Sequence, residues 1–372
     1  MESSLFDTAK SEGEQRMREG WEYKRLGELC DIVMGQSPMG NSINENNGIE
    51  FHQGKTNFGD KFLMESGIYT TSPIRIAEKK TILLCVRAPV GIINITERQV
   101  CIGRGLSSLK PRLGLELLYL YYCLLSKQNY FESNSTGSTF KAISSKVINN
   151  TIIQFPPKPT QLSIVSELDK LNELIQIKKE QLKDYDTLAQ SIFYEMFGDP
   201  VENEKGWEVK KFGALFKLKS GDGLSSKDFK TGIYPVYGGN GISGYHNSFN
   251  MKGCYIIIGR VGVYCGNVRK VDGEFWLTDN AFRLIYKENE QNPFFILYLL
   301  NILDLHQYAN AAAQPVISNL TLKSIDVPLP PLSLQQSFAQ KIEQIEQQKA
   351  AIQKTITDLE TLLAARMQYW FD

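Results

Sequence analysis

Amide and basic side chains placed between glycines are the residues of this sequence best suited to binding chemistry. An amide side chain can bond adenine through two atoms, and an arginine or lysine can bond guanine. Two segments, residues 51–60 and residues 234–240, combine such side chains with aromatic residues. The candidates for base contact are Gln53, Lys55 and Asn57 in the first half of the chain and Asn240, Arg260 and Gln314 in the second. Ordinary turns with solvated charges are the alternative interpretation of both segments.

Three further basic residues are predicted to hold phosphate rather than bases. Arg87 follows the apolar run of residues 81–86, Arg104 stands between two glycines, and Lys141 follows a loop of small polar residues at 135–139. That loop has a counterpart at residues 311–314. A cation at the end of a strand can reach a DNA groove, where phosphate contacts position a protein without reading sequence.

Signatures of catalysis are missing from the sequence. Residues 239–244 match G-x-G-x-x-G, but a dinucleotide site needs this loop to open a helix, and residues 245–250 are poor helix formers. We therefore predict a turn there. The chain holds no Walker A motif, no H-E-x-x-H and no Asn-Pro-Pro-aromatic run of an amino-methyltransferase. We predict that it has no catalytic residues, no metal site and no cofactor of its own.

Composition limits where the protein works and what it contacts. Six scattered cysteines without a C-x-x-C pair indicate reduced thiols in a cytoplasm. No stretch has 18 uninterrupted apolar residues, so we expect no membrane span. The net charge is zero, yet residues 20–155 carry 15 Lys and Arg against 11 Asp and Glu, and residues 206–328 carry 13 against 10. Two mildly basic blocks permit contact with DNA.

The elements that must position these residues are two long helices related by a shift of 174 residues, which places Gln161 on Gln335 and Phe197 on Phe371. Each carries apolar residues at alternating steps of three and four, a spacing typical of a coiled-coil seam. At ~1.5 Å per residue each helix would be about 55 Å long. Because neither helix can bury its stripe alone, we predict that they pair. The predicted seam residues are Leu168, Leu171, Ile175, Leu182, Tyr185, Ile342, Ile345, Ile352, Ile356 and Leu359.

The duplication extends to whole halves of the chain, because Gly20-Trp21-Glu22 returns as Gly206-Trp207-Glu208. A two-fold internal repeat must be recognised before other assignments. Each half then has short strands and one amphipathic helix, expected at residues 115–125 and 293–303. The strand near residues 92–95 is matched with residues 275–277.

The predicted fold class is α+β, with two globular domains separated by two long helices that form an antiparallel coiled coil in a pseudo-two-fold repeat. We expect a leader at residues 1–19, the first globular domain at 20–157, the first long helix at 158–200, the second domain at 201–331 and the second long helix at 332–372.

With these features the chain resembles the specificity subunit of type I restriction–modification systems, which has two target recognition domains. The resemblance rests on the duplicated Gly-Trp-Glu phrase, on the pairs of prolines before the long helices, and on four short motifs at residues 86–91, 103–106, 237–241 and 258–262. It covers residue 20 to the end.

The resemblance implies a non-catalytic subunit that reads a bipartite site on double-stranded DNA. In that family the helices hold the recognition domains apart and dock two methyltransferase (modification) subunits, and restriction subunits join the complex. SAM, ATP and Mg are then expected on partner subunits, which together act as an adenine DNA methyltransferase and an ATP-dependent endonuclease. Two other interpretations stay open: a scaffold that holds two protein-binding modules without DNA, and an enzyme whose site is not recognised.

Overall fold

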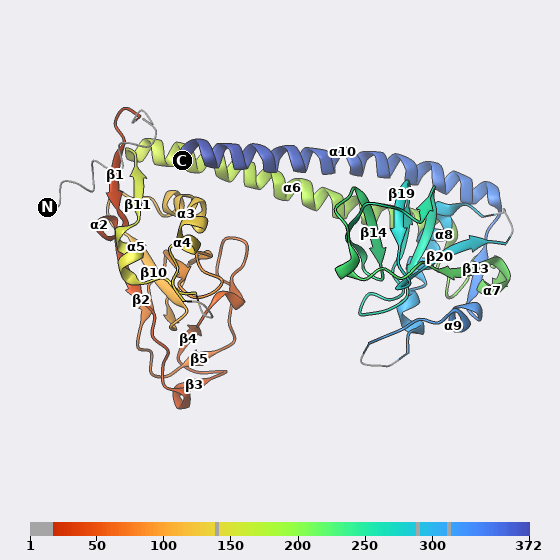
Figure 1. Cartoon of the computed structure of the whole chain (residues 1–372), viewed down its shortest axis with the longest axis horizontal. Helices are drawn as coiled ribbons and strands as arrows, with labels where there is room; N and C mark the ends of the chain where they lie inside the picture. Colours follow the sequence, from red (N-terminus) through yellow and green to blue (C-terminus); the bar gives the residue numbers. More distant parts are fainter. Residues whose placement is uncertain (1–17, 138–140, 288–290, 311–313) are drawn as a thin grey trace. The chain divides into compact units, whose positions relative to one another are not determined.

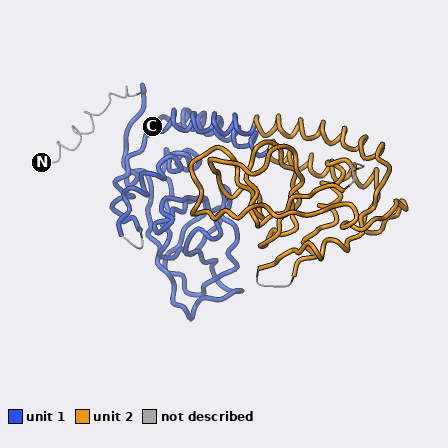
Figure 2. The backbone as a smooth tube through the Cα atoms, turned by 45° about the vertical axis from the view of Figure 1, so that its right-hand side comes forward, with its two compact units in different colours: residues 1–177, 356–372 blue, residues 178–355 orange. Residues whose placement is uncertain are grey.

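The computed structural model describes residues 18–137, 141–287, 291–310 and 314–372. Most of the predicted leader, residues 1–17, lies outside the described residues, as do parts of the two predicted polar loops, 138–139 and 311–313. The chain divides into two compact units (Figure 2). Unit 1 comprises Met1–Ile177 and Ile356–Asp372, and unit 2 comprises Lys178–Thr355.

Unit 1 combines short sheets with short helices (Figure 1). Its sheets have the orders β1-β11, β2-β10-β7-β8 and β3-β5-β4-β9-β6. Its elements are β1 (Glu22–Arg25), α2 (Leu26–Leu29), β2 (Cys30–Met34), η1 (Gly40–Ser42), β3 (Ile43–Asn44), β4 (Ile49–His52), η2 (Lys55–Asn57), β5 (Tyr69–Thr70), β6 (Ile76–Ala77), β7 (Thr81–Cys85), β8 (Ile93–Thr96), β9 (Val100–Ile102), β10 (Leu106–Pro111), α3 (Leu117–Ser126), α4 (Gln128–Ser133), α5 (Ser145–Asn150), β11 (Ile152–Phe155) and the first part of α6 (Lys158–Phe197).

Unit 2 repeats this arrangement, with sheets in the orders β12-β21, β13-β20-β17-β18 and β15-β14-β19-β16. Its elements, after the second part of α6, are β12 (Glu208–Lys211), α7 (Phe212–Leu215), β13 (Phe216–Ser220), η3 (Ser226–Asp228), β14 (Tyr234–Gly238), β15 (Gly241–His246), β16 (Met251–Lys252), β17 (Tyr255–Gly259), β18 (Val268–Val271), β19 (Glu274–Leu277), β20 (Ala281–Tyr286), α8 (Pro293–Ile302), η4 (Leu305–Tyr308), α9 (Asn319–Lys323), β21 (Asp326–Leu329) and α10 (Leu332–Phe371), whose last part belongs to unit 1.

The repeat predicted from the sequence is confirmed by this topology, but one strand match is wrong. The sequence predicts that residues 92–95 match residues 275–277, whereas positions in the sheets make β8 the counterpart of β18 and β9 the counterpart of β19. The basic pair Arg269 and Lys270 interrupts the apolar pattern of β18 and hides it as a strand.

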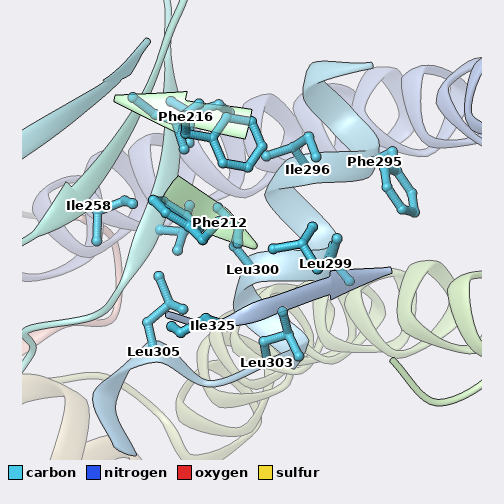
Figure 3. Close-up of a cluster of buried hydrophobic side chains, with 14 of the residues drawn as sticks. Phe212, Phe216, Ile258, Phe295, Ile296, Leu299, Leu300, Leu303, Leu305 and Ile325 are labelled. Atoms are coloured by element: carbon cyan, nitrogen blue, oxygen red, sulfur yellow. The ribbon is translucent and has the colours of Figure 1, made fainter. Parts of the chain in front are cut away.

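The central apolar runs are buried on both faces. In β7, Ile82 and Leu84 belong to one hydrophobic cluster, and Leu83 belongs to another on the opposite face. Alternate side chains of a strand point to opposite faces, so a strand between two packed layers must be apolar throughout. β17 has the same place in unit 2, and Figure 3 shows part of its main cluster, where Ile258 lies near residues of α7 and α8.

The long helices pair antiparallel. In unit 2, the rings of Phe197 and Phe338 lie 5.3 Å apart, and the Lys349 ammonium group lies 2.7 Å from the Asp186 carboxylate. Residue numbers therefore fall along α10 as they rise along α6. In unit 1 the guanidinium group of Arg366 binds the carboxylate of Glu167 through two nitrogens.

Each long helix has 40 residues, and the ten predicted seam residues are all buried or half-buried. Lys349, a polar residue in the seam, is half-buried and also binds Glu346 at 2.9 Å. Within the ranges that the structure covers, no helix is long and apolar enough to cross a membrane.

A buried glutamine fixes the start of each long helix. The Gln161 side chain accepts a hydrogen bond from the Glu116 backbone N–H (2.9 Å) and donates to the Gly114 and Pro156 carbonyl oxygens (3.0 and 2.9 Å). Gln335, which the sequence repeat places at the same position, accepts from the Asn292 N–H (2.9 Å) and donates to the Pro330 carbonyl (2.8 Å). These bonds tie α6 to the segment just before α3, tie α10 to the segment just before α8, and tie each long helix to its proline pair.

We predict that Gln161→Ala destabilises the protein. The substitution leaves the buried Pro156 carbonyl and two part-buried backbone groups without these partners, and a buried group left in this way costs about 1–3 kcal/mol. Urea unfolding should show a loss of at least that size. Gln176→Ala is the matched control, because Gln176 is an exposed glutamine of the same helix. Equal stability of the two variants would contradict a structural role for Gln161.

Candidate nucleic-acid interface

One pair of parallel strands determines where the candidate residues of unit 1 lie. β4 and β9 pair in parallel, with Phe51 opposite Cys101 and His52 opposite Ile102. Their carboxyl ends therefore meet, and Gln53 and Arg104 follow at the same edge. A Cβ atom on Gly105 would come within 2.1 Å of the Gln53 carbonyl oxygen, so only glycine allows this approach. Both predicted side chains are exposed there.

The other two predicted phosphate contacts join the same edge. Arg87 forms a β-bridge with Ala142, and the Ala88 N–H donates to the Lys141 carbonyl (3.1 Å). The Val86 N–H donates to the Gly105 carbonyl (2.9 Å), which links this pair to the turn at Arg104. We call the side chains Gln53, Arg87, Arg104 and Lys141 the unit 1 edge.

The unit 1 edge is basic and available to an anion. Its three cationic side chains are exposed, and none of them has an ion-pair partner among the described residues. Unpaired cations on an exposed edge can bind phosphates of DNA and so displace the counterions that surround it. The four residues were predicted as contacts, and the structure brings them together; their roles remain predictions.

The other two candidates of unit 1, Lys55 and Asn57, lie in η2, outside the unit 1 edge. Lys55 is exposed and borders a shallow pocket with Phe58 and Tyr121. Asn57 is half-buried, and its amide donates to the Glu65 carbonyl at 3.0 Å. The Asn57 side chain therefore holds its own loop in the free protein.

A charged network supports β4 just before the unit 1 edge. Glu50 accepts hydrogen bonds from two guanidinium nitrogens of Arg98 (2.6 and 2.8 Å), from the Ser66 N–H (2.7 Å) and from His52 Nε2 (2.9 Å). Arg98 also donates to the carbonyl oxygens of residues 63 and 64. Burial raises the pKa of Glu50, but these donors outweigh it and lower the pKa to about 2. Burial lowers the pKa of His52.

Unit 2 builds the corresponding edge on the parallel pair β14 and β19, with Tyr237 opposite Leu277. Asn240 follows β14 and is exposed. Arg260 follows β17, and its carbonyl accepts from the Ile317 N–H (2.9 Å). The Gly262 N–H donates to the carbonyl of Pro315, the residue after Gln314, which is exposed. The three predicted residues of unit 2 thus lie on segments that meet.

Arg260 is placed differently from the cations of unit 1. It is half-buried, its guanidinium carbon lies 5.4 Å from the centre of the Phe282 ring, and its Nη1 donates to the Asp279 carbonyl at 3.4 Å. Its Nε is buried without a partner among the described residues. The guanidinium group therefore packs against its own unit, which leaves less of it free for DNA than the prediction assumed.

The comparisons with known proteins fit this duplicated arrangement. The sequence model described as Type I restriction modification DNA specificity domain matches the chain twice, over residues 18–184 and 204–361. The chain belongs to this family. Its two matched segments correspond to the two halves of the internal repeat.

The relatives of the chain are named as specificity subunits of type I restriction enzymes. It is 34% identical over 178 residues to the putative type I restriction enzyme MjaX specificity subunit of Methanocaldococcus jannaschii, covering 47% of this chain and 42% of the relative. It is 26% identical over 236 residues to the type I restriction enzyme EcoprrI specificity subunit of Escherichia coli, covering 59% and 58%. The chain thus aligns with about half the length of these relatives.

The fold matches that of a solved structure. A type I restriction–modification system S subunit from M. genitalium superposes with a TM-score of 0.57 at 20% sequence identity, over 96% of this chain and 98% of that one. At this identity the likeness shows the fold.

Several candidate site residues of this specificity subunit family member are not predicted from its sequence. Arg269 and Lys270 of β18 border a shallow pocket together with Asn240 and Tyr237. Their signal was present, because two apolar valines flank the basic pair, but the strand was not recognised. Asp279, in the turn after β19, was also missed, because only the matched topology of the two units shows that it corresponds to Arg104.

We predict that the Glu50 network makes unit 1 acid-sensitive. The folded-state pKa of about 2 lies below the value of about 4.3 for an unfolded glutamate. Ionised Glu50 therefore stabilises the fold above about pH 4.5, and this contribution is lost as the pH falls towards 2. Glu50→Gln should lower the urea midpoint at pH 7. It should also reduce the fall in stability that wild type shows between about pH 4.5 and pH 2. Glu65→Gln, at an exposed neighbour, should keep the wild-type profile; a Glu50→Gln profile identical to wild type would disprove the assignment.

Proposed function

We propose that this chain is the sequence-specific DNA-recognition subunit of a type I restriction–modification complex, and that it reads a bipartite site. The observation that carries the proposal is that both units have a corresponding edge. Each edge is formed by a parallel strand pair, β4 and β9 in unit 1 and β14 and β19 in unit 2, and by matching turns. Family membership supports it, and so do the names of the relatives. The exposed cations of the unit 1 edge supply the charge that a DNA backbone requires.

The two units should read different words, because the side chains at their edges differ. Base readout depends on which donors and acceptors reach the groove. Unit 1 presents Gln53 with three cations, and unit 2 presents Asn240 and Gln314 with a half-buried Arg260. A shared frame with different side chains suits one subunit that reads an asymmetric split site.

Catalysis is assigned to partner subunits in this proposal. Two methyltransferase subunits would dock on the long helices and restriction subunits would complete the complex. The partners would carry SAM, ATP and Mg, so that this chain itself transfers no methyl group and cuts no DNA. The proposed setting is the cytoplasm, where DNA and these cofactors occur together.

The proposal is tested by selecting duplexes from a pool of random sequence with the purified full chain. We expect two short conserved words separated by unspecified pairs, and an affinity that falls steeply with salt as counterions are released. A scaffold for protein-binding modules would enrich no sequence. Methyl transfer to DNA by the chain with SAM alone would contradict the non-catalytic assignment.

We predict that Gln53→Ala relaxes one position of the first word and leaves the second word intact. Loss of an amide that bonds a base costs about 1–3 kcal/mol of discrimination at that position. The same selection measures the effect. Gln99→Ala is the control, because Gln99 is an exposed glutamine at the opposite end of β9. Relaxation of both words, or of neither, would remove Gln53 from the readers.

A further inference from the structure

The turn after β9 in unit 1 and the turn after β19 in unit 2 are held by the same backbone hydrogen bonds. The Gly103 N–H donates to the His52 carbonyl (2.7 Å), and the Thr278 N–H donates to the Tyr237 carbonyl (2.9 Å). Each turn is also closed by a bond between residues three apart. The Leu106 N–H donates to the Gly103 carbonyl (3.0 Å), and the Ala281 N–H donates to the Thr278 carbonyl (3.2 Å).

A third matched bond fixes the alignment of the two turns. The N–H after β7, at Val86, donates to the Gly105 carbonyl, and the N–H after β17, at Arg260, donates to the Asn280 carbonyl, both at 2.9 Å. Gly103, Arg104 and Gly105 therefore correspond one by one to Thr278, Asp279 and Asn280. The exposed middle residue is a cation in unit 1 and an anion in unit 2.

The turn at Asp279 is well fixed, whereas its carboxylate is free. Arg260 donates from its backbone N–H to the Asn280 carbonyl and from Nη1 to the Asp279 carbonyl. The Asn280 N–H also approaches Thr278 Oγ1 at 3.4 Å. Throughout the residues that the structure covers, the Asp279 carboxylate has no hydrogen-bond or ion-pair partner, so the fold does not use it, although the turn that carries it is held by hydrogen bonds.

In the major groove, a carboxylate at this place can bond directly to only one kind of group on the bases. It accepts hydrogen bonds and donates none. Phosphates repel it, and guanine offers only acceptors in the major groove. The donors there are the exocyclic amino groups of cytosine and adenine. An arginine in the corresponding turn has the opposite capacity, because it donates to phosphate or guanine.

We propose that Asp279 is a specificity-determining residue of unit 2, and that it accepts a hydrogen bond from an exocyclic amino group of the second word. The inference rests on the proposed function and deepens it. It assigns to unit 2 a preference for cytosine or adenine at one position, read through the amino group in the major groove, and it assigns to Arg260 the role of positioning the turn.

The test is duplex selection from the random pool with the full chain carrying Asp279→Ala. Wild type should require cytosine or adenine at one position of the second word. The variant should lose discrimination there by about 5- to 150-fold, the equivalent of one bidentate or charged base contact. The first word should be unchanged, which also shows that the variant is folded.

Two further variants sharpen the result. Asp272→Ala removes the same charge from an exposed aspartate at the opposite end of β19 and should select the wild-type motif. Asp279→Asn keeps an acceptor and adds a donor, so it should retain the motif where the base is adenine, which an amide can bond through two atoms, and relax it where the base is cytosine.

Some outcomes overturn the inference. If Asp279→Ala binds all duplexes more tightly but selects the wild-type motif, the carboxylate only repels the DNA backbone. Relaxation by Asp272→Ala equal to that of Asp279→Ala would reduce the effect to net charge. If the wild-type chain selects no motif, the proposed function itself fails, and that result is distinguishable from the other two.

Discussion

Burial of aromatic side chains between the long helices and the globular fold holds each unit together. In unit 2, Phe193 of α6 stacks on Phe295 of α8 with ring centres 5.9 Å apart, and it also contacts Phe338 of α10 at 5.6 Å. In unit 1, Phe371 of α10 lies 5.6 Å from Tyr119 of α3. These rings are almost completely buried, and such side chains dominate core energetics. Both long helices therefore contribute residues to the core of each unit.

The tryptophan of the repeated Gly-Trp sequence lies against the end of a long helix in each unit. In unit 2 the Trp207 indole N–H donates to the Phe197 carbonyl (2.8 Å), and the Lys205 ammonium group binds the Met196 carbonyl (3.1 Å) at the end of α6. In unit 1 Trp21 stacks on Trp370 near the end of α10, and Arg18 donates to the Tyr369 carbonyl. A cation at the carboxyl end of a helix is favourable, because the last carbonyl groups lack partners and carry partial negative charge. The tryptophan of each phrase therefore contacts the end of one long helix.

The frame could be predicted from the sequence because its signals are periodic or duplicated. The seam follows a spacing of three and four, and Gln161 and Gln335 occupy matching places. The reading edges were harder to predict, because their geometry depends on contacts between residues far apart in sequence. Arg260 looked like a free cation at a strand end, yet it packs on Phe282. Asp279 carried no local signal, since its correspondence with Arg104 appears only when matched backbone bonds align the turns.

Glycines explain how one frame can carry two different edges. The Gly35 N–H donates to the Leu106 carbonyl and the Gly221 N–H to the Ala281 carbonyl, so these glycines correspond. A Cβ atom on either would come within 2.1 Å of a backbone oxygen, of Gly103 in unit 1 and of Leu277 in unit 2. The backbone beneath each turn is therefore held by contacts that exclude side chains. The exposed middle residue meets no such limit, so its charge can change without moving the turn, and recognition can diverge while the fold is kept.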